Sequence, residues 1–233
     1  MATGRRGALA GALALMALVV AGVANAQVST SLTLQSDYRV RGVSLTDKRP
    51  VLSGALGYDS PSGFYAGGSL IAQDTADQGA QLLGHIEYFG FAFDRGSQLA
   101  WEVGVDNQNF KLGGPNSFRL KYTEVYVGVT RKDFSARIYY SPNYINSDWS
   151  AVYLSLDGAL RPADNWRVSG HVGVFKRLND TGDLRARADL QLGLTREFTG
   201  GEIQVSGTVA APGPLGEEGR ARPGLVVGAS LFF

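Results

Sequence analysis

Ionisable side chains recur at every second position in two stretches of the sequence. Asp37, Arg39 and Arg41 alternate with other residues in the first stretch, and three more charges alternate over 185–189 in the second. Residues two apart lie on one face of an extended strand. Because rings of charge set ion selectivity in membrane pores, this spacing predicts a wet, charged lining.

Other ionisable residues on the same predicted parity extend this lining. The predicted pore-lining set is Asp37, Arg39, Arg41, His85, Glu87, Glu102, Asp106, Glu124, Arg137, Arg167, His171, Arg185, Arg187 and Asp189. Since both signs are present, the pattern predicts weak charge selectivity for small polar solutes or ions. The same charges could instead pair across the interior, so a narrow channel and a plugged interior both stay open.

The two histidines are the candidates for catalysis. Barrel lipases and deacylases need a histidine paired with a serine and an orienting polar group, and neither His85 nor His171 stands in a recognisable hydrolase motif. No ligand spacing predicts a metal site. We therefore expect no catalytic residues, no metal and no cofactor. A lipid-modifying outer-membrane enzyme and a structural or adhesive barrel are the alternatives to a channel.

The elements that carry these residues are strands. After residue 26 no run of about 20 apolar residues predicts a spanning helix, whereas period-2 alternation recurs in twelve stretches. Most are near the length that a tilted strand needs to cross a bilayer. The predicted strands are 27–41, 50–58, 64–72, 81–93, 99–110, 118–130, 134–140, 150–159, 166–175, 183–196, 202–209 and 222–233.

The connections between these strands alternate strictly between short and long. This pattern, with an even strand count, is typical of an outer-membrane barrel with periplasmic turns, external loops and periplasmic termini. A soluble barrel of twelve strands would enclose a cavity too wide for side chains to fill. The sequence therefore predicts an all-β protein, a closed antiparallel transmembrane β-barrel whose apolar faces contact outer-membrane lipid.

Two predicted strands change parity along their length. In 81–93 and in 118–130 the apolar residues move from even to odd positions. A β-bulge shifts facing in this way, and rings near the rim that point inward would give the same pattern. Glu124 faces the interior if Val125, Val127 and Val129 face lipid. Both explanations stay open.

The first 26 residues are predicted to be a signal peptide rather than part of the barrel, which we place at 27–233. Arg5 and Arg6 precede an apolar run, and Ala24 and Ala26 form the cleavage pattern before Gln27. Removing two of the 22 Lys and Arg leaves 20 against 21 Asp and Glu, a balance that argues against a nucleic-acid partner. We expect export to the outer membrane of a Gram-negative bacterium, with the oligomeric state undetermined.

Both ends of the barrel carry further signals. Val227, Ala229, Leu231 and Phe233 form the apolar face of the last strand, a pattern similar to the C-terminal strand read by the barrel-insertion machinery. Aromatic residues near the short turns or the C-terminus predict an interfacial girdle. These are Tyr58, Phe64, Trp101, Phe134, Trp166 and Phe233.

Several motifs resemble one family. The stretch SDYRVRGVS over 36–44, followed by GFYAG over 63–67, resembles the opening of the proteobacterial TorF-type porins, the Gcw_chp family. YTEVY over 122–126 and YYSPNY over 139–144 look like its later motifs. The resemblance covers essentially all of 27–233. It implies an outer-membrane barrel with a pore, without implying which solute passes.

Overall fold

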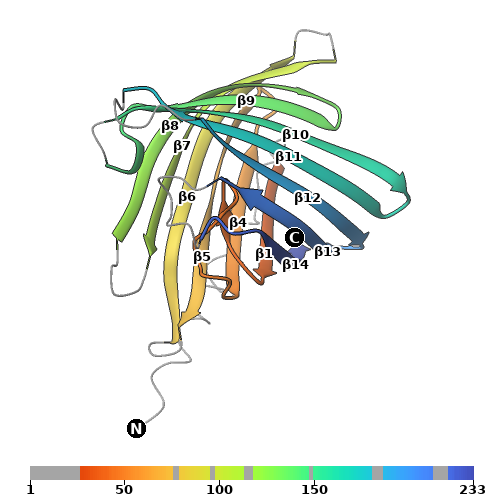
Figure 1. The fold of residues 1–233 in the computed structure, drawn as a ribbon. Coiled ribbons are helices and arrows are strands. Elements are labelled where there is room, and N and C mark those ends of the chain that lie inside the picture. Colours follow the sequence, from red (N-terminus) through yellow and green to blue (C-terminus); the bar gives the residue numbers. More distant parts are fainter. Residues whose placement is uncertain are drawn as a thin grey trace.

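The computed structural model describes residues 27–75, 79–94, 98–112, 118–146, 149–179, 186–211 and 220–233, which form a closed antiparallel barrel of twelve strands (Figure 1). The barrel strands are β1 (Gln27–Gln35), β4 (Val51–Asp59), β5 (Phe64–Thr75), β6 (Gly79–Asp94), β7 (Ala100–Leu112), β8 (Phe118–Arg131), β9 (Phe134–Ser141), β10 (Ala151–Ala163), β11 (Trp166–Arg177), β12 (Arg187–Phe198), β13 (Gly201–Ala210) and β14 (Gly224–Phe232). The predicted signal peptide lies outside the described residues.

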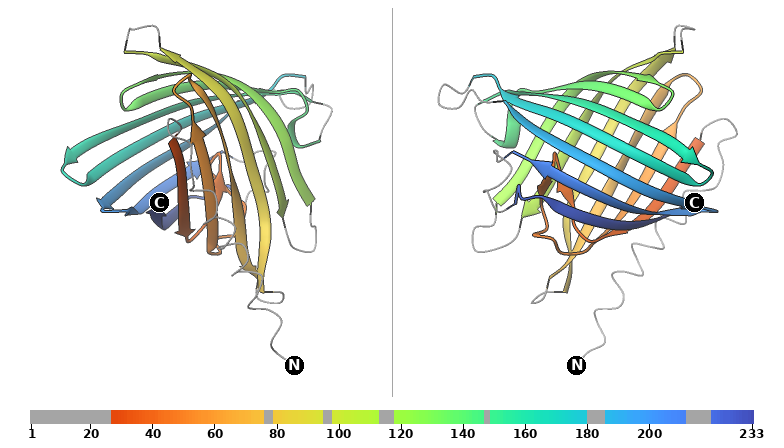
Figure 2. Two further views of the ribbon diagram at one scale, coloured as in Figure 1. Left: turned by 180° about the vertical axis from the view of Figure 1, so that it is seen from behind. Right: turned by 45° about the vertical axis from the view of Figure 1, so that its right-hand side comes forward.

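Every strand pairs with its neighbours in sequence, and the first strand pairs with the last to close the barrel. Leu32 in β1 is opposite Leu231 in β14, and the backbone amide of Thr30 bonds to the carbonyl of Phe233 at 3.3 Å. Closure leaves no free sheet edge, which hydrocarbon requires. Figure 2 shows the strands side by side around the barrel from two further directions.

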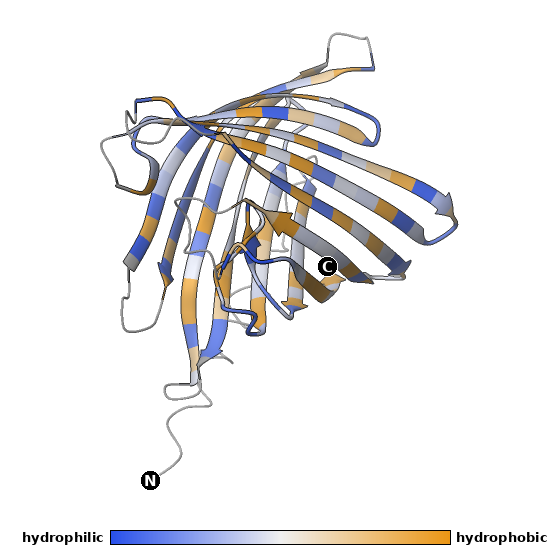
Figure 3. Cartoon of the chain, in the orientation of Figure 1, coloured by the Kyte–Doolittle hydropathy of each residue, from blue (hydrophilic) through white to orange (hydrophobic). Residues whose placement is uncertain are grey.

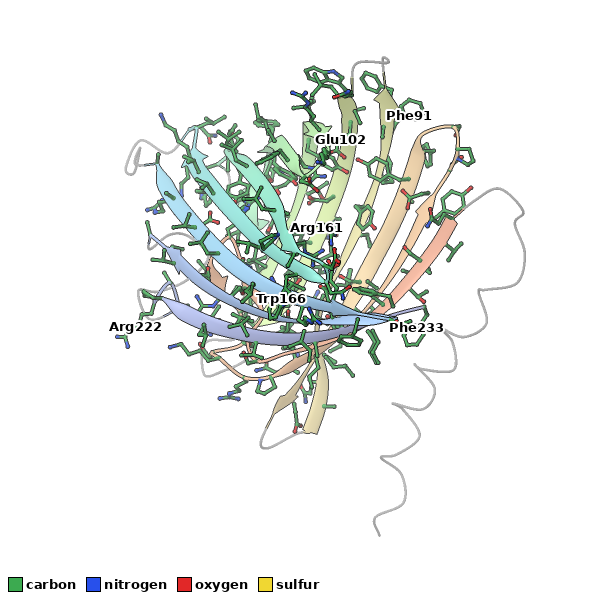
Figure 4. The ribbon with its side chains drawn as sticks, turned by 90° about the vertical axis from the view of Figure 1, so that its right-hand side faces the viewer. Phe91, Glu102, Arg161, Trp166, Arg222 and Phe233 are labelled. Atoms are coloured by element: carbon green, nitrogen blue, oxygen red, sulfur yellow. The ribbon has the colours of Figure 1, made fainter. Side chains whose placement is uncertain are left out.

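The two ends of the barrel differ, as predicted from the connections. Short connections at 60–63, 95–99, 132–133, 164–165 and 199–200 join the strands at one end. At the opposite end the connections 36–50, 142–150, 178–186 and 211–223 are longer, as predicted, whereas 76–78 and 113–117 are as short as the turns, because β5 to β8 extend beyond their predicted bounds. We call these the turn end and the loop end. In bacterial barrels the turn end faces the periplasm. Arg222 and Phe233, on either side of β14, lie at opposite ends (Figure 4).

Hydrophobic and hydrophilic residues alternate along most strands (Figure 3), and many of the large hydrophobic side chains are exposed. In β12, Leu190, Leu192 and Leu194 are exposed on the outside, whereas Asp189 and Thr195 are buried on the inside. The outward leucines would contact acyl chains, and the inward groups escape the cost of placing charge in lipid. This confirms the predicted facing. Among the described residues, no helix has the length and hydropathy to span a bilayer.

The two strands with shifting parity have different explanations. Strand β6 carries a bulge at Leu83, because Ile71 pairs with Gly84 whereas Ala72 pairs with Leu82. Strand β8 keeps one register along its whole length with β7. Its change of parity arises because Tyr122 and Tyr126 point inward and are buried.

The predicted first strand, 27–41, is wrong at its end. Strand β1 stops at Gln35, and residues 37–50 turn into the barrel as an inner loop that contains a small hairpin of β2 (Arg39–Val40) and β3 (Val43–Ser44). Apolar residues from this inner loop meet apolar residues of the barrel wall and form a core inside the loop end. The core includes Val43, Leu45, Val51, Ile71, Leu83, Phe110, Leu112, Leu120, Tyr122 and Tyr144.

The predicted aromatic residues lie on the outside of the barrel. All six are exposed, from 37% for Trp166 to 76% for Phe233. They flank the turn end, where amphipathic or bulky rings match the membrane interface. The exposed side chains of the last strand, Val227, Leu231 and Phe233, share this outer surface, while their recognition by insertion machinery stays a prediction.

Candidate functional site: the interior of the barrel

A polar cavity of about 670 Å³ occupies the interior between the inner loop and the turn end. It begins at residues 40–42 of the inner loop and extends to Lys132 and Asp133 in the turn between β8 and β9. Both signs of charge and several hydroxyl groups line it, a surface that suits water and polar solutes. The polar wall residues include Asp106, Gln108, Glu124, Arg137, Tyr139, Tyr153, Ser155, Asp157, His171, Asp189 and Gln191.

The tip of the inner loop is a tight two-residue turn. Val40 pairs with Val43, and the two residues between them, Arg41 and Gly42, have φ values of 50° and 74°. Two positive φ values define the type I′ turn, which favours glycine. A Cβ atom at Gly42 would lie 2.6 Å from the Cβ of Ala210. Glycine therefore serves both the turn and the close approach to the wall.

Asp37 holds the inner loop in shape. Its Oδ1 accepts hydrogen bonds from the hydroxyl groups of Ser44, at 2.6 Å, and Thr46, at 2.9 Å. Its Oδ2 accepts one from Nε of Arg39 at 2.6 Å, and Arg39 also donates to the carbonyl of Gly42 at 2.8 Å. Asp37 is only 3% exposed. Asp37 and Arg39 were predicted to line a strand facing the pore, and this is wrong, because they fold the loop upon itself.

Arg41 ties the inner loop to the barrel wall. Its Nη2 lies 2.5 Å from Oε2 of Glu124 in β8, and the two side chains are 9% and 1% exposed. Breaking a buried ion pair on one side costs about 3–5 kcal/mol, because a charge stays buried without compensation. Arg41 therefore reaches the cavity from the loop rather than from β1 as predicted, and Glu124 faces the interior.

Four aromatic rings surround the Arg41 guanidinium. Its Cζ lies 4.1 Å from the centre of the Tyr153 ring and 5.4–5.8 Å from those of Tyr122, Tyr144 and Phe175. Such cation–π contacts stabilise a desolvated cation by up to about 2 kcal/mol. Burial lowers the pKa of Arg41, but Tyr144 and Glu124 outweigh it and raise that pKa well above its ordinary value. The cation is therefore permanent.

Tyr144 comes from the segment between β9 and β10, in a short 3-10 turn, η1 (Tyr144–Asn146). Its ring is fully buried and packs on Tyr122 and Phe175 at centroid distances of 4.6 Å and 4.9 Å. Burial raises the pKa of Tyr144 to about 12, so the phenol stays neutral beside Glu124. Two loop segments thus meet inside the barrel at Arg41.

A second polar cluster centres on His171 in β11. Its Nδ1 lies 2.7 Å from Oδ1 of Asp157, and its Nε2 lies 2.9 Å from Oδ1 of Asp189. The hydroxyl of Tyr153 is 2.9 Å from the same Nε2, and that of Ser155 donates to Asp157 at 2.6 Å. With a carboxylate at each ring nitrogen, both nitrogens act as donors, which is the geometry of the imidazolium ion.

This arrangement does not resemble that of a hydrolase. A general-base histidine needs one ring nitrogen directed at a serine or another nucleophile, and both nitrogens of His171 contact carboxylates. Among the described residues, no group of three His, Asp or Glu side chains could hold a metal ion. The chemistry that the cluster offers is ionic and hydrogen-bonding contact with polar solutes.

Further ion pairs lie toward the turn end. Arg137 in β9 donates to Glu102 in β7 at 2.6 Å, and Arg167 in β11 donates to Glu202 in β13 at 2.7 Å. The hydroxyl of Tyr65 also donates to Glu102 at 2.9 Å. The predicted residues Glu102, Arg137 and Arg167 therefore face inward, and each of these two ion pairs crosses one intervening strand, β8 or β12.

His85 and Glu87 were predicted on the pore side, and this is wrong. The bulge at Leu83 reverses the facing of β6, so that both residues point outward with Phe89 and Phe91. Glu87 is 68% exposed, and its Oε1 lies 3.8 Å from Nε2 of His85. The cause is a local backbone irregularity, which alternation alone could not locate.

Some of the remaining predicted residues lie within the part of the chain that the structure describes, and others lie outside it. Asp106 in β7 and Asp189 in β12 line the cavity. Arg187, at the start of β12, shares the inward parity of Asp189. Arg185 lies outside the described residues, as do Ala24 and Ala26 of the predicted cleavage site, and Gln27 is the first residue of β1.

The aromatic residues around Arg41 and the acid Asp157 were missed in the sequence. Tyr122 and Tyr144 lie in motifs singled out for the family resemblance, YTEVY and YYSPNY. The family motifs singled out Tyr122 and Tyr144 but did not indicate a role for either. Both tyrosines contact Arg41, which lies about 80 to 100 residues earlier in the sequence. Asp157 lies in the predicted strand 150–159, whose other residues are all uncharged.

A closed twelve-strand barrel with an apolar outer face, a charged interior and aromatic residues at the turn end defines an outer-membrane β-barrel of a Gram-negative bacterium. The profile of a family described as "Bacterial protein of unknown function (Gcw_chp)" matches residues 21–211. The chain belongs to the Gcw_chp family. No curated protein is significantly similar to it in sequence.

Solved structures of similar fold are also outer-membrane proteins. The NanC porin has a TM-score of 0.54 at 10% identity, covering 88% of this chain and 99% of the porin. The KdgM porin has a TM-score of 0.50 at 8% identity, covering 88% and 98%. Outer membrane phospholipase A from Escherichia coli has a TM-score of 0.46 at 11% identity, covering 89% and 96%. At these identities the likeness shows the fold alone.

Proposed function

We propose that this barrel is a channel for small polar solutes or ions, without enzymatic activity, whose passage is controlled by the inner loop. The observation that carries the proposal is the polar cavity of about 670 Å³ inside the barrel, bounded by the inner loop and by the turn end. Charges and hydroxyl groups on the wall can take the place of the hydration shell of a polar solute or ion, so that its entry into the cavity costs little free energy. The TorF-type porin resemblance and the fold shared with the NanC and KdgM porins support the same role.

The charges of the cavity favour weak selectivity. Its lining contains three permanent cations, Arg41, Lys132 and Arg137, against five carboxylates. The imidazolium of His171 reduces the excess of negative charge to one. We therefore expect a mild preference for cations over anions, and the carboxylates are Asp106, Glu124, Asp133, Asp157 and Asp189.

The inner loop is the control element in this proposal. It fills the loop end with an apolar core, and the Arg41–Glu124 ion pair fastens its tip to the wall. Releasing that pair removes the strongest polar contact between loop and wall. A channel with a movable inner loop should then open more often.

Planar-bilayer conductance of the purified protein and of Glu124→Gln tests the proposal. We expect discrete ion steps, rarer in the wild type than in the variant, and a wild-type reversal potential that favours cations in a salt gradient. A matched control is Glu87→Gln, which changes an acid on the outer face and should leave the steps unchanged. Absence of steps in all three proteins would contradict the channel.

A structural barrel with a permanently plugged interior is the second candidate, favoured by the burial of Val43, Ser44, Leu45 and Thr46 in the inner loop. It predicts no ion steps even in Glu124→Gln. A lipid-modifying enzyme is tested separately by hydrolysis of phospholipid vesicles with wild type and His85→Ala. We expect no hydrolysis by either protein.

A further inference from the structure

Three cations gather on the outer face of the barrel near the loop end. Lys111 in β7 is directly opposite Arg119 in β8, and Lys121 lies two residues further along β8. Their neighbours Phe110, Leu112 and Leu120 are buried in the interior, so the three cations point outward, and all three are exposed. We call them the outer cationic cluster.

The cluster has no anionic partner within the described part of the chain. No carboxylate there lies within ion-pair distance of these cations, and Glu87, the nearest outward acid on β6, contacts His85 instead. The segment that joins the two strands, 113–117, reads Gly-Gly-Pro-Asn-Ser and contains no charged residue. Like charges directly opposite one another in a sheet are destabilising, so the arrangement calls for an external anion.

The depth of the cluster identifies the kind of anion. Along the outer face of β7 the sequence runs from Trp101, Val103 and Val105 to Asn107, Asn109 and then Lys111. Ten residues at about 3.3 Å, tilted by about 40°, rise about 25 Å, the height of the apolar band of such barrels. Lys111 therefore lies just above the band when Trp101 lies at the opposite interface.

We propose that the outer cationic cluster binds the phosphate groups of the phosphorylated glycolipid in the outer leaflet. The loop end of the barrel faces that leaflet, and its phosphates lie just above the acyl chains. Arg119 can bind a phosphate with two parallel hydrogen bonds, and the two lysines add compact charges.

Binding of purified lipid A to the full mature protein in detergent tests this proposal. The variant Lys111→Gln, Arg119→Gln, Lys121→Gln should bind bisphosphorylated lipid A roughly a hundredfold more weakly than the wild type, at about 1 kcal/mol for each cation. The control is Lys176→Gln, an isolated outward cation opposite the apolar Val152. We expect the control to bind as the wild type does.

A second arm needs no variant. Wild-type protein should bind dephosphorylated lipid A as weakly as the triple variant binds the bisphosphorylated form, which decides the question even if the triple variant does not fold. Equal affinity of the wild type for the two lipids, or an unchanged affinity of the folded triple variant, would overturn the proposal. Displacement of lipid A by inorganic phosphate at low millimolar concentration would identify free phosphate as the ligand and overturn the lipid assignment.

Discussion

The guanidinium of Arg41 lies 2.5 Å from the carboxylate of Glu124, although 83 residues separate them in sequence. One residue comes from the tip of a loop and the other from the inner face of strand β8. This contact joins the loop that enters the barrel to the wall that surrounds it.

Glu124→Gln should release the inner loop. The substitution leaves Arg41 buried without its counter-ion, which disfavours the docked loop by about 3–5 kcal/mol. The chain contains no cysteine, so a single Val43→Cys substitution reports on loop release through thiol labelling. Val43 is 4% exposed, and we expect slow labelling alone and at least tenfold faster labelling with Glu124→Gln. Equally slow labelling would show that the aromatic rings around Arg41 hold the loop without the ion pair.

Gly42→Ala should destabilise the same loop for a different reason. Alanine at φ 74° is strained, and its Cβ would lie 2.6 Å from that of Ala210. We expect a loss of about 1–3 kcal/mol in the free energy of unfolding, measured by urea titration in lipid vesicles. Gly207→Ala is the control, because no atom lies within 4 Å of its added Cβ. A similar small loss in both variants would contradict the close packing of the turn.

Leu190→Arg should impair membrane insertion. Leu190 faces outward, between Val172 of β11 and Val209 of β13, so an arginine there would find only apolar neighbours and lipid. Its cost near mid-membrane is about 2–4 kcal/mol. Arg187→Leu, on the inward parity of the same strand, should insert normally. Heat-modifiable gel migration measures the folded fraction, and identical migration of the two variants would contradict the assigned facing.

His171→Leu should shift the ion selectivity of the proposed channel. The change removes the cation between Asp157 and Asp189 and leaves two carboxylates in the cavity without their shared partner. We expect the reversal potential in a salt gradient to move further toward the equilibrium potential of the cation. Lys176→Gln also removes one positive charge, but on the outer face, and should leave the reversal potential unchanged. An equal shift in both variants would assign the effect to overall charge rather than to the cavity.

The alternation of residue types determined much of this protein. Leu190, Leu192 and Leu194 alternate along the strand with the polar residues Asp189 and Gln191. With hydrocarbon outside the barrel and water inside, only the arrangement with the leucines facing outward is stable. The number of alternating stretches likewise predicted twelve strands, and the connection lengths predicted two different ends. These features are local, because each depends on residues within one strand or one turn.

Only the tertiary structure showed at which residues the alternation no longer tells which side chains face the interior. Asp37, Arg39 and Arg41 continue the period-2 pattern of β1, yet the I′ turn at Arg41 and Gly42 carries them into the interior as a loop. One extra residue at Leu83 turns His85 and Glu87 from the inside to the outside. Arg41 depends on Glu124, a partner 83 residues further along the chain, and the facing of His85 and Glu87 depends on the register that β6 adopts with β5. A pattern of alternating residues contains no information about either of them.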